Sequence, residues 1–455
     1  MQMKLISPID NIFLLGESRE HPMHVGGLQL FAPPDGAGPD FVREAYEAML
    51  SATDVQPTFR KHPAFLGGIT NIAWSSDKDI DLEYHLRRSA LPRPGRVREL
   101  LELTSRLHGS LLDRHRPLWE MHLIEGLDDG RYALYCKMHH ALIDGVSAQR
   151  LTQRVLSPDP NDEELRVPWA LKPPRRKGSG RGPSPLQRVT STAGSIAALA
   201  PSTLGLVRHG LLEQQLTLPF QAPKTMFNVR IGGARRVAAQ SWSLERFKRV
   251  KAAAGGVTVN DVILAMCAGA LRAYLLEHSA LPETPLVAMV PVSLRSDKDH
   301  DRGGNMVGTV LCNLATHLDD PAKRLDAIHA SMAENKKVFT QLPQIEQFAL
   351  SAFLSGGVAL ALVPGFVSNA PPPFNIVISN VPGPREPHYW NGARLDGNYP
   401  LSIALDGQAL NITMTNNVDN LDFGLVGCRA SVPHLQRLLG HLETSLKDLE
   451  RAAGV

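Results

Sequence analysis

The residues in this sequence best suited to chemistry are two adjacent histidines, His139 and His140, followed by Asp144 and Gly145. A histidine side chain titrates near neutral pH, so its neutral form can take a proton from a hydroxyl group during attack on a carbonyl. We assign His140 as this general base, and we expect His139 and Asp144 to fix its backbone and ring. Gly145 permits a tight entry into the segment that follows. The predicted chemistry is proton removal from an alcohol.

Three other interpretations of these residues stay open. Two histidines and an aspartate can ligate zinc, although a third His or Cys at metal-site spacing is missing nearby. Asp144 can be only a helix cap or a buried ion-pair partner. His139 can be a packed structural residue, because adjacent residues leave a strand in opposite directions.

The elements around the histidines place them in a turn between a strand and a helix. Residues 131–137 have the apolar, aromatic character of a strand. Residues 146–156 have the pattern of a helix, and Asp144 sits where an N-cap residue belongs. Such a turn can hold a side chain at the edge of a cavity on a rigid scaffold. We therefore expect His140 at the edge of a cavity.

Composition indicates a soluble globular protein of more than one domain. The 455 residues are 43% hydrophobic and 20% charged, which allows a substantial core. A net charge of +3 is too mild to indicate nucleic acid binding. The four cysteines contain no CxxC pair, and residues 1–8 lack a hydrophobic signal core. We expect reduced thiols in a cytoplasmic protein.

A change in composition divides the sequence into two predicted domains of the α/β class. Residues 1–156 carry the histidine pair. Residues 157–225 form a linker with a helical segment, because Pro, Gly, Ser and Arg dominate the first part. Residues 226–455 open with a strand and then a helix, and they form the second domain.

Two segments ahead of the histidines have clear periodicity. Residues 80–87 alternate as a half-exposed strand does, and residues 98–114 have helical spacing. Trp119 then begins a strand, where it is either a core aromatic residue or a wall of a substrate channel.

An uncharged apolar stretch at residues 348–367 is long enough to span a bilayer. Two glycines and two serines interrupt it, and no basic cluster flanks it, so we favour a helix that lines an apolar pocket or touches a membrane interface. The small residues Gly356, Gly357 and Ala361 leave room for an alkyl chain. Close helix packing explains them equally well.

A polar pair, Asn260 and Asp261, occupies the first turn of a predicted helix. At least one of the two is expected to cap that helix. The amide of Asn260 can alternatively face the catalytic pocket and stabilise an oxyanion.

The motif HHxxxDG, from His139 to Gly145, resembles that of the acyl-CoA-dependent acyltransferase superfamily, whose fold is chloramphenicol acetyltransferase-like. Further blocks occur in the order expected for bacterial wax ester synthase/diacylglycerol acyltransferases: Ser7-Pro8-Ile9-Asp10, Pro22-Met23-His24-Val25-Gly26-Gly27, Arg116-Pro117-Leu118-Trp119-Glu120, Asn260-Asp261, Pro291-Val292-Ser293-Leu294-Arg295 and Asn380-Val381-Pro382-Gly383-Pro384. HHxxxDG alone also occurs in condensation domains of peptide synthetases. The full series is highly specific, and it runs from about residue 5 to residue 440, leaving out a linker near 157–190.

The resemblance implies two chloramphenicol acetyltransferase-like domains with mixed sheets flanked by helices, and an active-site channel between them. It implies an O-acyltransferase with acyl-CoA as co-substrate, a fatty alcohol or diacylglycerol as acceptor, and no bound cofactor or metal. It also suggests a structural ion pair between Asp144 and Arg295, and Ser379 joins the substrate-binding candidates. We expect the protein in the cytoplasm, peripheral at the inner membrane or on lipid inclusions.

The mechanism expected is direct transfer, because the sequence has no G-x-S-x-G elbow and no cysteine in an activating pattern. Two alternatives stay open. One is a condensation-type acyltransferase that uses carrier-bound donors, although no carrier domain is recognisable. The other is a non-catalytic lipid-body-binding protein, which leaves His140 unexplained.

Overall fold

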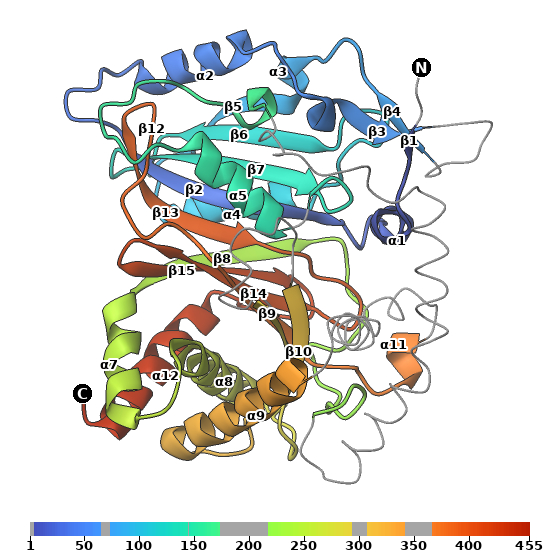
Figure 1. The fold of residues 1–455 in the computed structure, drawn as a ribbon, viewed down its shortest axis with the longest axis vertical. Coiled ribbons are helices and arrows are strands. Elements are labelled where there is room, and N and C mark those ends of the chain that lie inside the picture. The colour runs from blue at the N-terminus through green and yellow to red at the C-terminus, as the bar shows by residue number, and fades with distance from the viewer. Residues whose placement is uncertain (1–3, 65–72, 144, 173–216, 294–306, 342–365) are drawn as a thin grey trace. The chain divides into compact units, whose positions relative to one another are not determined.

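The computed structural model (Figure 1) describes residues 4–64, 73–143, 145–172, 217–293, 307–341 and 366–455. The chain divides into two compact units, and each combines segments that are far apart in the sequence. Unit 1 consists of Met1–Leu171, Val229–Arg249 and Ser379–Gly440, and unit 2 consists of Lys172–Asn228, Val250–Ile378 and His441–Val455. These units interleave along the chain. The predicted division at residues 156 and 225 cuts the chain into consecutive segments, whereas the two units are built from non-contiguous ones. The predicted division therefore stays a prediction.

Unit 1 contains a six-stranded sheet with the strand order β12, β13, β2, β7, β6, β5. Neighbouring strands are antiparallel, except that β5 and β6 are parallel. In that order the strands are Tyr389–Trp390, Ala393–Leu401, His24–Ala32, Tyr132–His139, Trp119–Glu125 and Leu86–Ala90. The strand predicted at residues 131–137 is therefore β7, one of the two central strands of this sheet.

Two helices cover opposite faces of this sheet. Helix α4 (Val97–His108) packs Leu100 and Leu101 into one core cluster with Leu28 and Ala133 of the sheet. Helix α5 (Gly145–Val155) lies across β2, β7 and β13 on the other face, as Figure 1 shows. The helix predicted at residues 146–156 is thus α5, and it follows the turn that holds His140.

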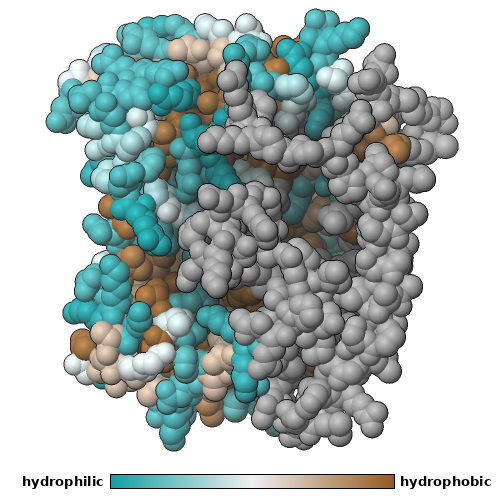
Figure 2. Space-filling model, in the orientation of Figure 1, coloured by the Kyte–Doolittle hydropathy of each residue, from teal (hydrophilic) through white to brown (hydrophobic). Residues whose placement is uncertain are grey.

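The remaining elements of unit 1 surround this sheet. Helix α1 (Pro8–Gly16) is capped by the Ser7 hydroxyl, which accepts a hydrogen bond from the Asp10 N–H. The outer side of α2 is hydrophilic (Figure 2) and carries an exposed ion pair between Arg43 and Glu47. The other elements are α2 (Phe41–Ser51), α3 (Leu82–His85), 3-10 turns at Pro57–Arg60 and Pro168–Ala170, and a small sheet of β1 (Lys4–Leu5), β4 (Ala73–Ser76) and β3 (Lys61–Pro63).

Unit 1 also holds three antiparallel strands from the second half of the chain. Strand β15 (Asn420–Cys428) pairs with β14 (Leu410–Asn417) on one side and with β8 (Arg235–Ser243) on the other. The division between the units falls within three elements, namely β11 (Ile376–Val381), α7 (Leu244–Ala254) and α12 (Arg437–Ala453).

Unit 2 is built around the long helix α8 (Val259–Glu277) and strand β9 (Val287–Ser293). Strand β9 pairs antiparallel with β10 (Val307–Asn313) and parallel with Ile376 and Val377 of β11. Helices α9 (Pro321–Gln341) and α11 (Phe366–Asn369) complete its described elements. Among the described residues, α8 alone is long and apolar enough to cross a membrane. However, 67% of its most apolar 18-residue segment is buried inside the structure, as expected for a core helix.

The first turn of α8 is closed by a reciprocal cap. The Thr258 hydroxyl accepts from the Asp261 N–H at 3.2 Å, and the Asp261 carboxylate accepts from the Thr258 N–H at 2.8 Å. Asp261 is therefore the member of the predicted polar pair that caps the helix. Asn260 lies beside it, half-buried.

Two predictions from periodicity were wrong in part. Residues 80–87 form the short helix α3 followed by the start of β5, because the Asp81 carboxylate caps a helical turn by accepting from the Tyr84 N–H at 3.2 Å. The helix predicted over residues 98–114 ends at His108. The apolar stretch proposed to line a pocket lies almost wholly outside the described residues.

Candidate active site

His140 stands in the turn between β7 and α5, half-buried and fixed from two directions. Its backbone N–H donates to the Met23 carbonyl at 2.8 Å. Its ring stacks on the Phe13 ring of α1, with centroids 4.0 Å apart and planes at 19°. Backbone and ring orientation are therefore both set by the N-terminal segment of unit 1, which sequence reasoning did not anticipate.

His139, the last residue of β7, is fully buried. Its Nδ1 accepts a hydrogen bond from the Ala141 N–H at 3.1 Å. The neutral ring must therefore carry its proton on Nε2, and this atom lies 3.4 Å from Oε1 of Glu17. The pair fixes one tautomer and one orientation of the ring.

Glu17 is the centre of this buried arrangement. Its carboxylate accepts from Nε of Arg114 at 2.9 Å and from the Met23 N–H at 3.2 Å. Burial raises the pKa of Glu17, but the hydrogen bonds from His139, Met23 and Arg114 outweigh burial and lower the pKa below its ordinary value. Glu17 is thus ionised at neutral pH, and through Met23 it supports the backbone position of His140.

A second buried ion pair lies on the α4 side of the sheet. The ammonium of Lys137 is 3.3 Å from the Glu120 carboxylate and donates to the Leu107 and Ser110 carbonyls at 3.1 and 2.9 Å. Burial lowers the pKa of Lys137, and Glu120 offsets only part of that shift. Lys137 thereby holds the end of α4 against the sheet. No local sequence pattern indicates this contact.

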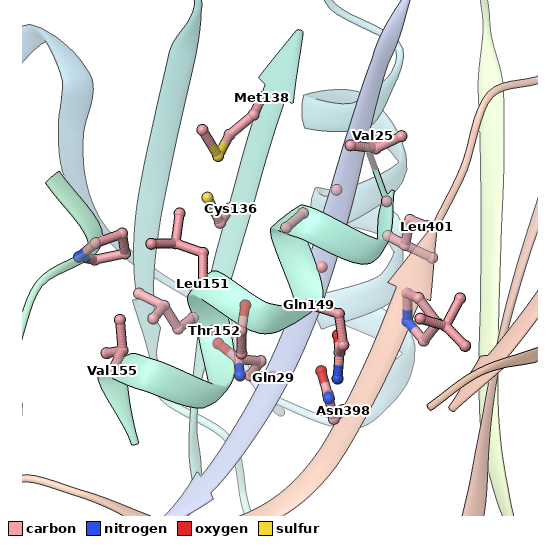
Figure 3. Close-up of a pocket in the computed structure, with 18 of the residues that line it drawn as sticks. Val25, Gln29, Cys136, Met138, Gln149, Leu151, Thr152, Val155, Asn398 and Leu401 are labelled. Atoms are coloured by element: carbon pink, nitrogen blue, oxygen red, sulfur yellow. The ribbon is translucent and has the colours of Figure 1, made fainter. Parts of the chain in front are cut away.

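A pocket of about 140 Å³ lies between α5 and the sheet. Its floor is one face of the two central strands, because the lining residues alternate along each strand. Strand β2 contributes Val25, Gly27, Gln29 and Phe31, and β7 contributes Leu134, Cys136 and Met138. Met138, which precedes the histidine motif, and Gly145, its last residue, line the pocket, while neither His139 nor His140 does. The expected place of His140 at the edge of a cavity therefore stays a prediction. Figure 3 shows the α5 side chains that face the strands.

One flank of this pocket is polar. Gln29 and Asn398 are register partners on β2 and β13, so their side chains leave the same face of the sheet. Gln149 and Thr152 face this flank from α5, and Figure 3 shows Gln149 pointing toward Asn398. The amide nitrogens of Gln29, Gln149 and Asn398 are buried and have no hydrogen-bond acceptor among the described residues. A buried donor without a partner typically costs about 1–3 kcal/mol.

The predicted site residues fall into three groups. Gly145, the first residue of α5, and Ser379 line the pocket. Asn260 belongs to unit 2. Asp144, Arg295, Gly356, Gly357 and Ala361 lie outside the described residues.

Trp119, proposed as a substrate contact, is instead packed in the core of unit 1. Its ring is 1% exposed and stacks on His85 with centroids 4.5 Å apart. Its indole nitrogen donates to the Phe59 carbonyl at 2.9 Å. The side chain does not line the described pocket, so of the two interpretations the structure favours the core aromatic residue.

In the part of the chain that the structure describes, no group of three or more His, Cys, Asp or Glu residues is arranged to hold a metal ion. The cysteines of this part are free thiols, with Cys267, Cys312 and Cys428 buried and Cys136 half-buried at the pocket.

Comparison with known proteins covers nearly the whole chain. Residues 6–263 match the wax ester synthase/diacylglycerol acyltransferase catalytic domain, and residues 303–450 match the C-terminal domain of the same proteins. The chain is 67% identical to a putative diacylglycerol O-acyltransferase of Mycobacterium bovis, with 100% of both chains covered. It is 42% identical to the O-acyltransferase WSD of Acinetobacter baylyi, covering 98% of this chain and 97% of that one.

Solved structures agree with these matches. A wax ester synthase/diacylglycerol acyltransferase from Marinobacter aquaeolei VT8 superimposes with a TM-score of 0.81 at 41% identity, and both chains are covered completely. The starter condensation domain of rhizomide synthetase gives a TM-score of 0.58 at 13% identity, covering 100% of this chain and 95% of that one, which shows a shared fold alone. The predicted α/β fold with mixed sheets flanked by helices is confirmed.

Proposed function

This chain belongs to the wax ester synthase/diacylglycerol acyltransferase family, and we propose that it moves a long-chain acyl group from acyl-CoA to the hydroxyl of a fatty alcohol or a diacylglycerol. The observation that supports this proposal is His140, a half-buried imidazole that Met23 and Phe13 hold in the turn between β7 and α5, two elements that also line a largely apolar pocket. An O-acyltransferase needs one group that removes the acceptor's proton, and we assign that role to His140.

The transfer proceeds in two steps with His140 as the base. His140 takes the hydroxyl proton while the alcohol oxygen attacks the thioester carbon, giving a tetrahedral intermediate. The carbon–sulfur bond then breaks, and the protonated His140 returns the proton to the departing CoA thiolate. The products are an ester and free CoA, and no bond to the protein forms. Water must be kept from the thioester, because it would compete with the alcohol.

His139, Glu17 and Arg114 act on this reaction by position. The buried carboxylate of Glu17 fixes the His139 ring and the Met23 backbone, and Met23 in turn holds His140. His140 is thereby kept in one orientation without paying conformational entropy at each turnover.

Three roles extend this proposal to residues of the family pattern. Asn260 would stabilise the oxyanion of the intermediate, and Asp144 would pair with Arg295 to hold the motif loop. The small residues Gly356, Gly357 and Ala361 would leave space for an alkyl chain. The family resemblance of the blocks that contain Asn260, Asp144 and Arg295 supports the first two roles, and the small size of the three residues supports the third.

We also propose that the protein works in the cytoplasm, peripherally at the inner membrane or on lipid inclusions. Its acceptors are lipids that partition into such surfaces. Two large apolar side chains of unit 1, Leu5 and Leu15, are each 69% exposed near the N-terminus. These two exposed side chains support contact with an apolar surface.

The test is a thiol-release assay with the purified full chain. Palmitoyl-CoA is mixed with hexadecanol or with diolein, and free CoA is counted while the ester product is identified by chromatography. Acceptor-dependent thiol release with formation of the matching ester supports the proposal. Thiol release without acceptor indicates a hydrolase, and transfer only from acyl-carrier protein indicates a condensation-type enzyme.

A further inference from the structure

Three primary amides gather on one flank of the pocket beneath α5, and the transfer reaction gives them no role. Gln29 comes from β2, Asn398 from β13 and Gln149 from α5, so three separate elements bring them together. Gln29 is 8% and Asn398 3% exposed. Their arrangement is built into the sheet, because Gln29 and Asn398 are direct register partners.

In each of the three amides the buried side-chain atom that lacks a hydrogen-bond partner, within the part of the chain that the structure describes, is the nitrogen, which only donates. Nε2 of Gln29, Nε2 of Gln149 and Nδ2 of Asn398 are each buried without an acceptor among the described residues. Buried donors in native proteins are almost always paired. The partner that suits them is an acceptor oxygen, which either an ordered water or a carbonyl or hydroxyl group of a bound molecule can supply.

The amides are set back from the reacting bond. Gln29 is five residues along β2 from His24, whose register partner is His139, and five strand residues span roughly 17 Å. Gln29 and its register partner Asn398 are therefore too far along the sheet to stabilise the oxyanion. An extended chain advances about 1.2 Å per bond, so the distance corresponds to roughly 10 to 14 bonds once side-chain reach is allowed for.

The wall between the motif and the amides is apolar. Val25, Gly27, Cys136 and Met138 line that part of the pocket. Gly27 leaves open space, because a Cβ built on it would meet no atom within 4 Å. Methylenes suit such a wall. The pantetheine arm of CoA does not, because its amides need polar partners along their whole length, and the ester carbonyls of diacylglycerol lie only a few bonds from the reacting hydroxyl.

We propose that Gln29, Gln149 and Asn398 form a subsite for an oxygen atom in the distal half of the transferred acyl chain. The enzyme would accordingly take hydroxy- or oxo-acyl-CoA in preference to the plain acyl-CoA of equal length. This inference rests on the proposed function and names a substrate class for it. Beyond the amides the pocket is apolar again at Phe31 and Val155, so the chain continues past its oxygen.

The experiment compares three donors with hexadecanol as the common acceptor. They are stearoyl-CoA, 12-hydroxystearoyl-CoA and 3-hydroxystearoyl-CoA, whose oxygen lies next to the reacting bond. The quantity measured is kcat/KM for each hydroxylated donor divided by that for stearoyl-CoA. The 12-hydroxy ratio should be about 2 to 10, the gain from one neutral hydrogen bond. The 3-hydroxy ratio should be about 1 or less, because its oxygen meets the apolar wall.

The variants Gln149→Leu and Asn398→Leu should each bring the 12-hydroxy ratio down to about 1. The matched control is Gln153→Leu, the same exchange on the same helix at a residue that does not line the pocket, and it should keep the wild-type ratio. Both kcat/KM values in a ratio are measured on the same protein sample, so a smaller fraction of folded enzyme lowers both equally and leaves the ratio unchanged. Melting temperatures identify any variant that fails to fold, and Gln29→Leu, which removes the third amide, then serves as the second pocket variant and should also bring the 12-hydroxy ratio to about 1.

Two results would overturn the inference while leaving the proposed function intact. One is equal use of stearoyl-CoA and 12-hydroxystearoyl-CoA by the wild type. The other is a rise in KM for every acyl-CoA in the variants, which would assign the amides to the CoA arm. Absence of transfer from any donor, stearoyl-CoA included, would instead contradict the proposed function itself.

Discussion

The carboxylate of Glu17 lies 3.4 Å from Nε2 of His139, and both side chains are buried within unit 1. The same carboxylate accepts the Met23 N–H, and the Met23 carbonyl accepts the N–H of His140. Glu17 is therefore linked to His140, the proposed base, by two hydrogen bonds to the backbone of Met23. A buried charge placed in this way couples the stability of the fold to the precision of the site.

We predict that Glu17→Gln lowers both stability and kcat. The amide keeps the shape but removes the charge that Arg114 and His139 face, so unfolding free energy should fall by about 2–4 kcal/mol. The value of kcat should fall about tenfold with KM for palmitoyl-CoA little changed, because His140 is displaced and the substrate pocket is not. Urea unfolding and steady-state kinetics measure these effects.

The pH dependence of that loss gives a control. The folded-state pKa of Glu17 lies below its ordinary value, so its contribution is present above the unfolded pKa near 4.5 and disappears as pH falls through the folded value. The unfolding free energies of wild type and Glu17→Gln should therefore differ at pH 7 and become similar at acid pH. An equal difference in unfolding free energy at pH 7 and pH 3 would contradict the assignment of an ionised Glu17.

The buried pair of Lys137 and Glu120 should be costly to break from one side. Lys137→Met leaves the Glu120 carboxylate buried without its ammonium, with an expected loss of about 3–5 kcal/mol in unfolding free energy. The double variant with Glu120→Leu should recover a large part of this loss. Arg98→Met, which removes an exposed ion pair with Glu102 in the same unit, is the control and should cost about 0.5 kcal/mol or less. A Lys137→Met protein as stable as that control would show that the pair carries no buried charge.

Asp422 should destabilise the protein at neutral pH. Burial raises its pKa to about 6, although Ser241, the Asn398 N–H and Asn417 act in the opposite direction. An acid whose pKa is raised in the folded state favours folding most at pH values below its unfolded-state pKa, which is near 3.8 for Asp422. The unfolding free energy then falls as the pH rises from there to about 6.

The exchange Asp422→Asn removes this penalty and keeps an oxygen for the Asn398 N–H, which the carboxylate accepts at 2.7 Å. The variant should be more stable than wild type by up to about 3 kcal/mol at pH 8, with the difference vanishing near pH 4. Thermal unfolding across that range measures it. A variant less stable than wild type at pH 8 would mean that the charge of Asp422 is needed.

The sequence predicts the elements that local periodicity defines and misses the contacts between distant segments. The apolar run at residues 131–137 and the helical pattern at 146–156 became β7 and α5, with His139 at the end of β7 and His140 in the turn between them. The end of α4 was missed although Gly109 caps it, and the contacts of Lys137 with the Leu107 and Ser110 carbonyls come from a strand about thirty residues away.

The candidate site follows the same rule. The histidine motif is visible in the sequence because its residues are contiguous. Glu17 was missed because its partners Arg114 and His139 are far along the chain, at sequence separations no local pattern spans. The three pocket amides were missed for the same reason, since only the pairing of β2 with β13 brings Gln29 beside Asn398.

The central claim is that His140 removes the acceptor's proton, and one comparison tests it most directly. CoA release from palmitoyl-CoA with hexadecanol is measured for wild type and for His140→Ala, with melting temperatures recorded on the same samples. The kcat of His140→Ala should fall by ~10²–10⁴ while its melting temperature stays within a few degrees of wild type. A folded His140→Ala protein that keeps wild-type turnover would contradict the central claim.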